Sequence, residues 1–509
     1  MIHPYSHYLA RAGRHWPNKA AIVDGGTVLT YAQLDQRASE LAAGLRALGL
    51  GRGDRVAIVH ENNHRYVESV CAVARAGGVF VPMLGALTPR EHAYMLADSE
   101  ARLVIALSPD GSRRAHELCR ERSGVRVVEA FAHAALSSAS AEAPDGAPDD
   151  LGQILYTSGT TGKPKGVMHS FASISAGIAA WATGAGIRHD DRLLGHFALS
   201  HFGGRVMDSG ICTGATLVIL PKPDPVEILA AIGAQRISVL LMVPTLLQML
   251  LDHPDVTSCD LSSLRLVLYA AAPASPTLVR RAFEAFGPIL ATGFGQTEAY
   301  GLSTFLSSAE HHAALEAGGA RLASIGREAD SSVQVRLLNP DGSDTARGEV
   351  GEICVCAPWV MKGYWKLPEL TAQTLKDGWL RTRDLGRQDD DGYFYLADRQ
   401  DDMIISGGFN VYPREVEDVI AAVPGVRECC VVGVPDAKWG EAVRAIVVAA
   451  SVDGATIIAH CKAQLAAFKV PKQVDFVAEL PKSSVGKILR RAARAPFWQG
   501  RERGIHGAE

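Results

Sequence analysis

The chain has 509 residues, more than one hydrophobic core accommodates, which indicates two or more domains. Its hydrophobic content of 47% and charged content of 21% are typical of a globular protein, and a net charge of −4 favours neither a nucleic acid nor an anionic membrane as partner. Because the nine cysteines contain no C-x-x-C pair and no stretch is typical of a signal peptide or a membrane span, we expect a cytoplasmic protein with reduced thiols and no integral membrane contact.

The first part of the chain predicts helices that alternate with buried strands. A helix from Thr30 to Leu48 is indicated by a threonine N-cap and by apolar residues that recur on one face. A strand is expected at 55–59, and the order repeats with a helix at 91–98 and a strand at 103–105. Such alternation is typical of a parallel sheet covered by helices.

A second α/β region is expected further along the chain. Residues 137–150 are small, acidic and proline-containing, which predicts a loop that leads into a strand at 154–156. The next region extends from about residue 193 to 290. Its clearest strands are expected at 216–220, 239–243 and 266–269.

The last third of the chain changes character. Short strands and turns from 324 to 396 indicate a β-rich subdomain, and shorter helices and strands follow Arg399. We therefore predict an α/β fold with a large N-terminal domain, residues 1–399, made of two helix-covered sheets plus a β-rich subdomain. Residues 400–509 are expected to form a small, mobile C-terminal α+β domain.

The most informative segment is YTSGTTGKPKGV at 156–167. Glycine lets the backbone turn sharply and bring N–H groups close to a ligand, while the hydroxyls and lysines supply donors for phosphate oxygens. The segment follows a predicted strand, and the carboxyl ends of strands are where α/β folds bind ligands. Its spacing excludes a Walker A loop, which requires Gly, four residues and then Gly-Lys-Ser/Thr.

This segment resembles the phosphate loop of the adenylate-forming superfamily, which includes acyl-CoA synthetases, firefly luciferase and peptide-synthetase adenylation domains. Further matching motifs follow in the family's order, and the resemblance extends from about Tyr31 to Arg490. These motifs are GFGQTE at 293–298, GWLRTRDL at 378–385, RQDD at 399–402, SGGFNVYP at 406–413 and PKSSVGK at 481–487.

The resemblance implies an AMP-forming acid–thiol ligase. A carboxylate attacks the α-phosphate of ATP to form an acyl-adenylate, and the thiol of coenzyme A then takes the acyl group as AMP leaves. The first step brings two anions together, so the site must supply positive charge and hydrogen-bond donors. ATP, Mg²⁺, coenzyme A and a small carboxylic acid are the implied ligands.

The resemblance also assigns residues to the nucleotide. Thr297 would donate to the α-phosphate, Glu298 would coordinate Mg²⁺, and Asp384 and Arg399 would contact the ribose. The β- and γ-phosphates would be held by Thr157, Ser158, Gly159, Thr160, Thr161, Gly162, Lys163 and Lys165. The adenine wall and second nucleotide motif would comprise Ala270, Ala271, Ala272, Pro273, Gly293, Phe294, Gly295 and Gln296.

The small domain would contribute to both half-reactions. Lys487 would reach the α-phosphate and the carboxylate during adenylation. Gly407 and Gly408 would line the tunnel for the pantetheine of coenzyme A after the domain rotates about a hinge at Asp401.

His201 matches a position that relatives place beside the acyl pocket. Amino-acid-activating relatives carry an aspartate there to pair with the ammonium group, so activation of an α-amino acid is disfavoured. The expected pocket is apolar apart from Arg205, which favours an aliphatic or aromatic monoacid, and the preference reverses if Arg205 points inward. The expected lining comprises Trp181, His201, Val206, Tyr269, Ala270, Gly293 and Ala299.

The chain departs from the family pattern in four respects. Arg383 and Asp398 replace the glycines that usually precede the ribose aspartate and arginine, and Ala270 replaces a glycine near the acyl channel. Ile405 and Gly407 stand where many relatives carry lysines, which leaves the contacts of the small domain less determined than those of the large one.

Three other functions share most of these motifs. An acyl-AMP ligase that loads a carrier protein is the main alternative, and a luciferase-like oxidative enzyme and a non-catalytic paralogue are the others. The sequence Trp439-Gly440-Glu441 after Pro435-Asp436 resembles the acyl-CoA synthetase branch. We expect no nucleic-acid partner and allow for a homodimer.

Overall fold

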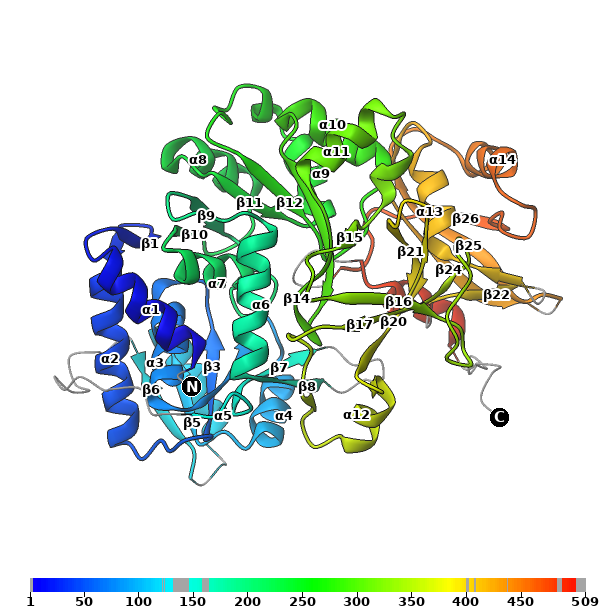
Figure 1. The fold of residues 1–509 in the computed structure, drawn as a ribbon. Helices are drawn as coiled ribbons and strands as arrows, with labels where there is room; N and C mark the ends of the chain where they lie inside the picture. The colour runs from blue at the N-terminus through cyan, green and yellow to red at the C-terminus, as the bar shows by residue number, and fades with distance from the viewer. Residues whose placement is uncertain are drawn as a thin grey trace.

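The computed structural model describes residues 3–120, 122, 124–130, 146–157, 164–399, 402–406, 409–436, 438–482 and 488–499. Figure 1 shows two large sheets with helices on their faces, a β-rich layer beside them and a smaller C-terminal unit. The predicted α/β class and its large and small parts are confirmed. The boundary between residues 399 and 400 stays a prediction because Gln400 and Asp401 lie outside the described residues.

One large sheet has seven strands in the order β18-β8-β7-β4-β3-β5-β6. The strands are β3 (Arg55–His60), β4 (Val79–Leu84), β5 (Leu103–Ala106), β6 (Arg126–Glu129), β7 (Leu151–Thr157), β8 (Lys165–Ser170) and β18 (Gly363–Tyr364). The five strands from β7 to β6 run parallel, whereas β8 and β18 are antiparallel to their neighbours. Its connecting helices are α3 (His64–Ala76), α4 (Pro89–Ser99) and α5 (Pro109–Cys119).

The other large sheet has nine strands in the order β15-β14-β13-β12-β11-β9-β10-β1-β2. The strands are β1 (Ala20–Asp24), β2 (Thr27–Thr30), β9 (Arg192–Gly195), β10 (Thr216–Ile219), β11 (Val239–Met242), β12 (Leu266–Tyr269), β13 (Leu290–Gln296), β14 (Ala299–Leu306) and β15 (Arg327–Glu328). The associated helices are α1 (Pro4–His15), α2 (Tyr31–Ala47), α6 (Phe171–Gly184), α7 (Gly204–Thr213), α8 (Pro225–Gln235), α9 (Pro244–Leu251), α10 (Pro276–Phe286) and α11 (Ser308–Glu316), with short 3-10 turns η2 (Pro254–Thr257) and η3 (Ala320–Ala323).

The main hydrophobic core lies between the two sheets. Ile58 of one sheet and Leu241 of the other belong to one buried cluster, which α2, α3, α6 and α7 fill. Helices α8 to α11 cover the outer face of the nine-stranded sheet, and α4 and α5 cover that of the seven-stranded sheet. The helix expected from Thr30 forms as α2, where Thr30 and Gln33 make a reciprocal capping box.

The β-rich sheet extends from the large domain toward the C-terminal unit. It contains β16 (Gln334–Leu338), β17 (Gly351–Cys356), β19 (Leu375–Lys376), β20 (Trp379–Gln388) and β21 (Phe394–Arg399), with α12 (Pro368–Thr374) beside it. The C-terminal unit contains β22 (Ile404–Ser406), β23 (Phe409–Val411), α13 (Pro413–Ala421), β24 (Val426–Asp436), β25 (Gly440–Ala449), α14 (Gly454–Gln464), β26 (Gln473–Phe476), α15 (Arg490–Arg494) and η4 (Ala495–Trp498).

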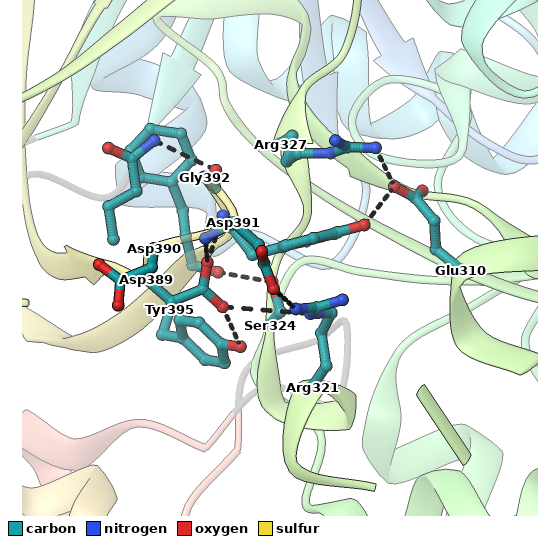
Figure 2. A network of polar contacts seen from close by, with 12 residues as sticks. Glu310, Arg321, Ser324, Arg327, Asp389, Asp390, Asp391, Gly392 and Tyr395 are labelled. Atoms are coloured by element: carbon teal, nitrogen blue, oxygen red, sulfur yellow. Dashed lines mark hydrogen bonds and ion pairs between the residues drawn. The ribbon is translucent and has the colours of Figure 1, made fainter. Parts of the chain in front are cut away.

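A polar network anchors the turn between β20 and β21 to α11 and η3 (Figure 2). Glu310 of α11 accepts hydrogen bonds from Arg327 at 2.9 Å and from the hydroxyl of Tyr393 at 3.0 Å. The guanidinium carbon of Arg321 lies 4.0 Å from the ring centroid of Tyr393, and Arg321 also pairs with Asp391. Because β21 ends at Arg399, these contacts position the end of the large domain that carries the predicted ribose arginine.

Among the residues that the structure describes, no helix combines the length and the apolar character needed to cross a bilayer.

Candidate active site

The predicted phosphate loop connects two antiparallel strands. Strand β7 ends at Thr157 and β8 begins at Lys165, and these two residues are paired across the strands. Ser158, Gly159, Thr160, Thr161, Gly162 and Lys163 lie outside the described residues. The two ends of the loop are therefore adjacent at the carboxyl end of β7, as the sequence predicts.

Tyr364 links Lys165 to the predicted metal ligand Glu298. The ammonium nitrogen of Lys165 lies 5.5 Å from the ring centroid of Tyr364, and the Tyr364 hydroxyl donates to Oε1 of Glu298 at 2.8 Å. Burial and the charge of Glu298 raise the pKa of Tyr364, while the charge of Arg383 opposes that rise. The hydroxyl therefore keeps its proton at neutral pH and orients the Glu298 carboxylate.

Thr297 and Glu298 form the tip of the hairpin between β13 and β14. Gln296 pairs with Ala299, so these two residues alone make the turn. Nε2 of His169 lies 2.7 Å from the carbonyl oxygen of Thr297, and burial lowers the pKa of His169 to about 4. A carbonyl only accepts hydrogen bonds, so the neutral ring donates from Nε2 and holds the tip in place.

The predicted ribose residues meet on one carboxylate. Asp384 of β20 is buried and faces Arg399 of β21 in the strand register, with Nε of Arg399 3.2 Å from its Oδ1. Nε2 of Gln296, at the end of β13, donates to Oδ2 of Asp384 at 2.5 Å and to the carbonyl of Thr382 at 3.0 Å. The second nucleotide motif and the ribose motif therefore share one site.

The predicted adenine wall lies beside the second nucleotide motif. Strands β12 and β13 are parallel neighbours in which Tyr269 pairs with Thr292, so residues 270–273, which follow the end of β12, lie beside residues 293–296, which continue β13. Ala271 has a φ of 68°, and Arg383, before the ribose aspartate, has a φ of 61°. This left-handed conformation favours glycine, which accounts for the glycine usual at the position of Arg383 and concentrates backbone strain at the site.

His201 lies beside the end of β7. Its Nδ1 is 2.9 Å from the hydroxyl of Ser200, and it makes a hydrogen bond with the backbone of Tyr156, the residue before Thr157. Burial lowers the pKa of His201 to about 4, so the imidazole is neutral at physiological pH. His201 is therefore a neutral side chain beside the strand that leads into the predicted phosphate loop, and its role beside the acyl group stays a prediction.

Arg205 is partly buried, with its side chain 11% exposed, and its charge is balanced inside the protein. Nη1 of Arg205 lies 3.2 Å from Oδ2 of Asp208 and donates to the carbonyl of Tyr300 at 3.1 Å, while its guanidinium carbon lies 3.7 Å from the Tyr300 ring centroid. The hydroxyls of Tyr5 and Tyr300 also bind Asp208. This pairing removes the reason to expect a second carboxylate on the substrate.

Several predicted residues remain without a structural description. Lys487, Gly407, Gly408 and the hinge residue Asp401 lie outside the described residues, so their roles stay predictions. The expected pocket residues Trp181, Val206, Tyr269, Ala270 and Ala299 are all buried.

Two residues of the site have no counterpart in the sequence predictions. Tyr364 approaches Glu298 because β18 pairs with β8, and His169 approaches Thr297 from β8 itself. Tyr364 follows a glycine in Lys362-Gly363-Tyr364-Trp365, but no spacing to other polar residues indicates its role.

Family models, known protein sequences and solved structures were found that are similar to this chain. A family model described as AMP-binding enzyme matches residues 9–365, and one described as AMP-binding enzyme C-terminal domain matches residues 415–487. A medium/long-chain-fatty-acid–CoA ligase, FadD8, of Mycobacterium tuberculosis is 39% identical over 98% of this chain and 91% of its own length. A feruloyl-CoA synthase of Amycolatopsis is 39% identical over 96% of this chain and 98% of its own length. Among solved structures, the amide bond synthetase McbA from Marinactinospora thermotolerans is 33% identical and superimposes with a TM-score of 0.89 over 97% of this chain and all of its own.

Proposed function

The chain belongs to the AMP-binding enzyme family and is an AMP-forming acid–CoA ligase that uses ATP and coenzyme A, and from this premise we propose that it activates an aliphatic or aromatic monocarboxylic acid. The main support for this site is that the side chains of Gln296 and Arg399 both contact the carboxylate of Asp384.

We propose that Asp384 binds the ribose of ATP. Each carboxylate oxygen has two lone pairs, so Asp384 can accept the ribose hydroxyls while Gln296 and Arg399 hold it in place. An ionised acceptor makes charge-assisted hydrogen bonds, which are stronger than neutral ones. Residues 270–273 follow the end of β12 beside residues 293–296 of β13, and these two segments would bind the adenine and the α-phosphate.

The carboxylate of Glu298 fits a magnesium ion bound together with ATP. Mg²⁺ prefers oxygen ligands and is commonly held by one or two carboxylates together with substrate phosphates. Within the described part of the chain, no group of three or more His, Cys, Asp or Glu side chains could hold a metal by itself. Glu298 would therefore share the ion with phosphate oxygens, and the ion would offset their charge as the acid attacks.

We propose that Lys487 supplies the charge at the α-phosphate and that neutral His201 lies beside the acid. Because Arg205 is already paired with Asp208, it offers no unpaired positive charge to a second carboxylate of the substrate. A monoacid therefore suits the site better than a diacid. One relative is named a fatty-acid–CoA ligase and another a feruloyl-CoA synthase, which gives one aliphatic and one aromatic precedent for the acid.

The first experiment is a panel of acids assayed for pyrophosphate release with MgATP. Octanoate, palmitate, benzoate and ferulate represent monoacids, and malonate and glutarate are the matched diacids. We expect release with at least one monoacid, AMP as the nucleotide product, and an acyl-CoA identified by mass spectrometry when coenzyme A is present. Formation of ADP would contradict the proposal, and a preference for a diacid would contradict the part that concerns the acid.

The group that accepts the acyl chain needs a separate test. A structural neighbour is named an amide bond synthetase, so the fold is compatible with an acceptor other than coenzyme A. Acyl-AMP accumulation with coenzyme A present, followed by transfer to an added carrier protein, would favour the acyl-AMP ligase alternative. A cytoplasmic location and a homodimer remain predictions from the sequence.

A further inference from the structure

Asp398 is a buried carboxylate at the junction of the large domain and the C-terminal unit. It is 8% exposed, and it directly precedes Arg399 in the chain. Its Oδ1 accepts a hydrogen bond from the backbone N–H of Arg399 at 2.7 Å, and its Oδ2 accepts one from the backbone N–H of Arg414 at 2.9 Å. Arg414 belongs to α13, so this carboxylate joins β21 to the C-terminal unit.

Asp398 also binds Arg490 of α15. Nη1 of Arg490 lies 3.3 Å from Oδ1 of Asp398 and 3.2 Å from Oδ2 of Asp402, while Nη2 donates to both carboxylate oxygens of Glu417 at 2.7 Å. Asp402, Glu417 and Arg490 all follow residue 400, whereas Asp398 precedes it. Asp398 is thus the member of this cluster that ties it to the large domain.

The cluster is asymmetric in charge. Three carboxylates surround one guanidinium, so Arg490 keeps two partners within the C-terminal unit if the contact with Asp398 is lost. Burial raises the pKa of Asp398 to about 6, with the charge of Arg490 opposing and that of Glu417 adding to the rise. Removing Asp398 therefore takes away a contact between the two parts of the protein and leaves the other contacts of Arg490 in place.

The two ends of this contact adjoin residues of the proposed adenylation site. Arg399 follows Asp398 directly and contacts the predicted ribose carboxylate Asp384 at 3.2 Å. Lys487, the proposed adenylation lysine, lies three residues before Arg490 in the chain. The Asp398–Arg490 pair therefore connects the ribose side of the large domain to the segment that carries the lysine.

We propose that Asp398 is a positioning residue for adenylation. It holds the C-terminal unit against β21 through Arg490 and the N–H of Arg414, and it thereby favours the domain arrangement in which Lys487 serves the α-phosphate. The role of Lys487 rests on the proposed function, whereas the contact between the two parts does not.

The variants are Asp398→Asn, which keeps an acceptor for one of the two backbone N–H groups but removes the charge that faces Arg490, and Asp398→Gly, which removes the side chain altogether. The matched control is Asp475→Asn. Asp475 accepts from Nη2 of Arg444 at 2.9 Å and joins β25 to β26 inside the C-terminal unit. It is an arginine–carboxylate pair of the same kind that does not cross between the two parts.

A measurement without substrate tests the contact itself. Spin labels introduced through unnatural amino acids at exposed Glu284 in α10 and Lys462 in α14 report the distance between the two parts of the full chain. We expect Asp398→Asn and Asp398→Gly to broaden or shift the distance distribution and Asp475→Asn to leave it unchanged. A wild-type distribution in both Asp398 variants would overturn the proposal.

Half-reaction assays then test the positioning role, with the best monoacid of the panel as the probe. We expect Asp398→Asn to lower ATP–pyrophosphate exchange about tenfold, the loss typical of one charge-assisted hydrogen bond, and to change thioester formation from the prepared acyl-AMP less than about twofold. Equal losses in both steps would overturn the proposal. If the wild-type protein exchanges no pyrophosphate with any acid, the proposed function fails, whereas the label distances still decide whether Asp398 holds the two parts together.

Discussion

The amide nitrogen of Gln296 donates a hydrogen bond of 2.5 Å to Asp384, a residue 88 positions later in the chain. Gln296 ends β13 of the nine-stranded sheet, whereas Asp384 lies in β20 of the β-rich sheet. One hydrogen bond therefore joins two sheets at the point where we propose that ATP binds. The orientation of the Asp384 carboxylate depends on both sheets.

Replacement of Asp384 by alanine is expected to weaken ATP binding. The variant has no carboxylate at this position and therefore loses the charge-assisted hydrogen bonds to the ribose, each worth about 1.5–3 kcal/mol. Isothermal titration with MgATP measures the change. Asp390→Ala, in the exposed turn between β20 and β21, is the control and should bind ATP normally. Equal affinity of the Asp384 variant and the wild type would show that another group holds the ribose.

Replacement of Tyr364 by phenylalanine should raise the Mg²⁺ concentration needed for half-maximal pyrophosphate exchange about tenfold. The variant loses the hydroxyl that donates to Glu298 at 2.8 Å, and loss of such an outer contact typically costs 10- to 100-fold in metal affinity. Tyr395→Phe is a matched control, because the Tyr395 hydroxyl donates to Asp389 at the same distance of 2.8 Å, in the anchoring network of Figure 2. A Mg²⁺ dependence that does not change in Tyr364→Phe would argue against Glu298 as the ligand.

The Lys487→Ala variant should lose adenylation while it still converts prepared acyl-AMP into acyl-CoA. Loss of one preorganised charge at the transition state typically costs about 10²–10³ in rate, roughly 3–4 kcal/mol. Lys482→Ala is the control in the same motif, since Lys482 pairs with Glu428 at 2.6 Å. If both half-reactions fell equally, Lys487 would have a structural role instead.

Replacement of Asp208, the buried partner of Arg205, by alanine should both destabilise the protein and change its preference among carboxylic acids. Asp208 is 1% exposed, and breaking a buried ion pair by removing one member typically costs about 3–5 kcal/mol. Asp208→Ala should therefore lower the midpoint of thermal unfolding and raise the activity with glutarate relative to octanoate.

The matched control for that experiment is the double variant Arg205→Leu/Asp208→Leu, which removes both charges. It should regain much of the lost stability, because an apolar pair carries no desolvation cost, and it should not accept glutarate. An Asp208→Ala variant with wild-type stability would mean that Arg205 finds another partner.

Much of the fold was predictable because its signals are local. The threonine N-cap that begins α2 and the apolar runs of β3 and β5 follow from periodicity and from residues that favour caps. The site residues Thr157, Lys165, Gln296, Thr297, Glu298, Asp384 and Arg399 were also named from their motifs, and the structure brings these residues to connected positions.

The sequence by itself determined the two-part α/β architecture and the motif residues, because helix and strand periodicity and glycine-rich loops depend on neighbours in the chain. Only the tertiary structure decided what those residues contact. The guanidinium of Arg205 lies against the ring of Tyr300, which is 95 positions away in the chain, and Asp398 meets Arg490 across 92 positions. The electrostatic state of a buried charge depends on which groups surround it in space, and packing of the sheets and helices, not spacing along the chain, selects those groups.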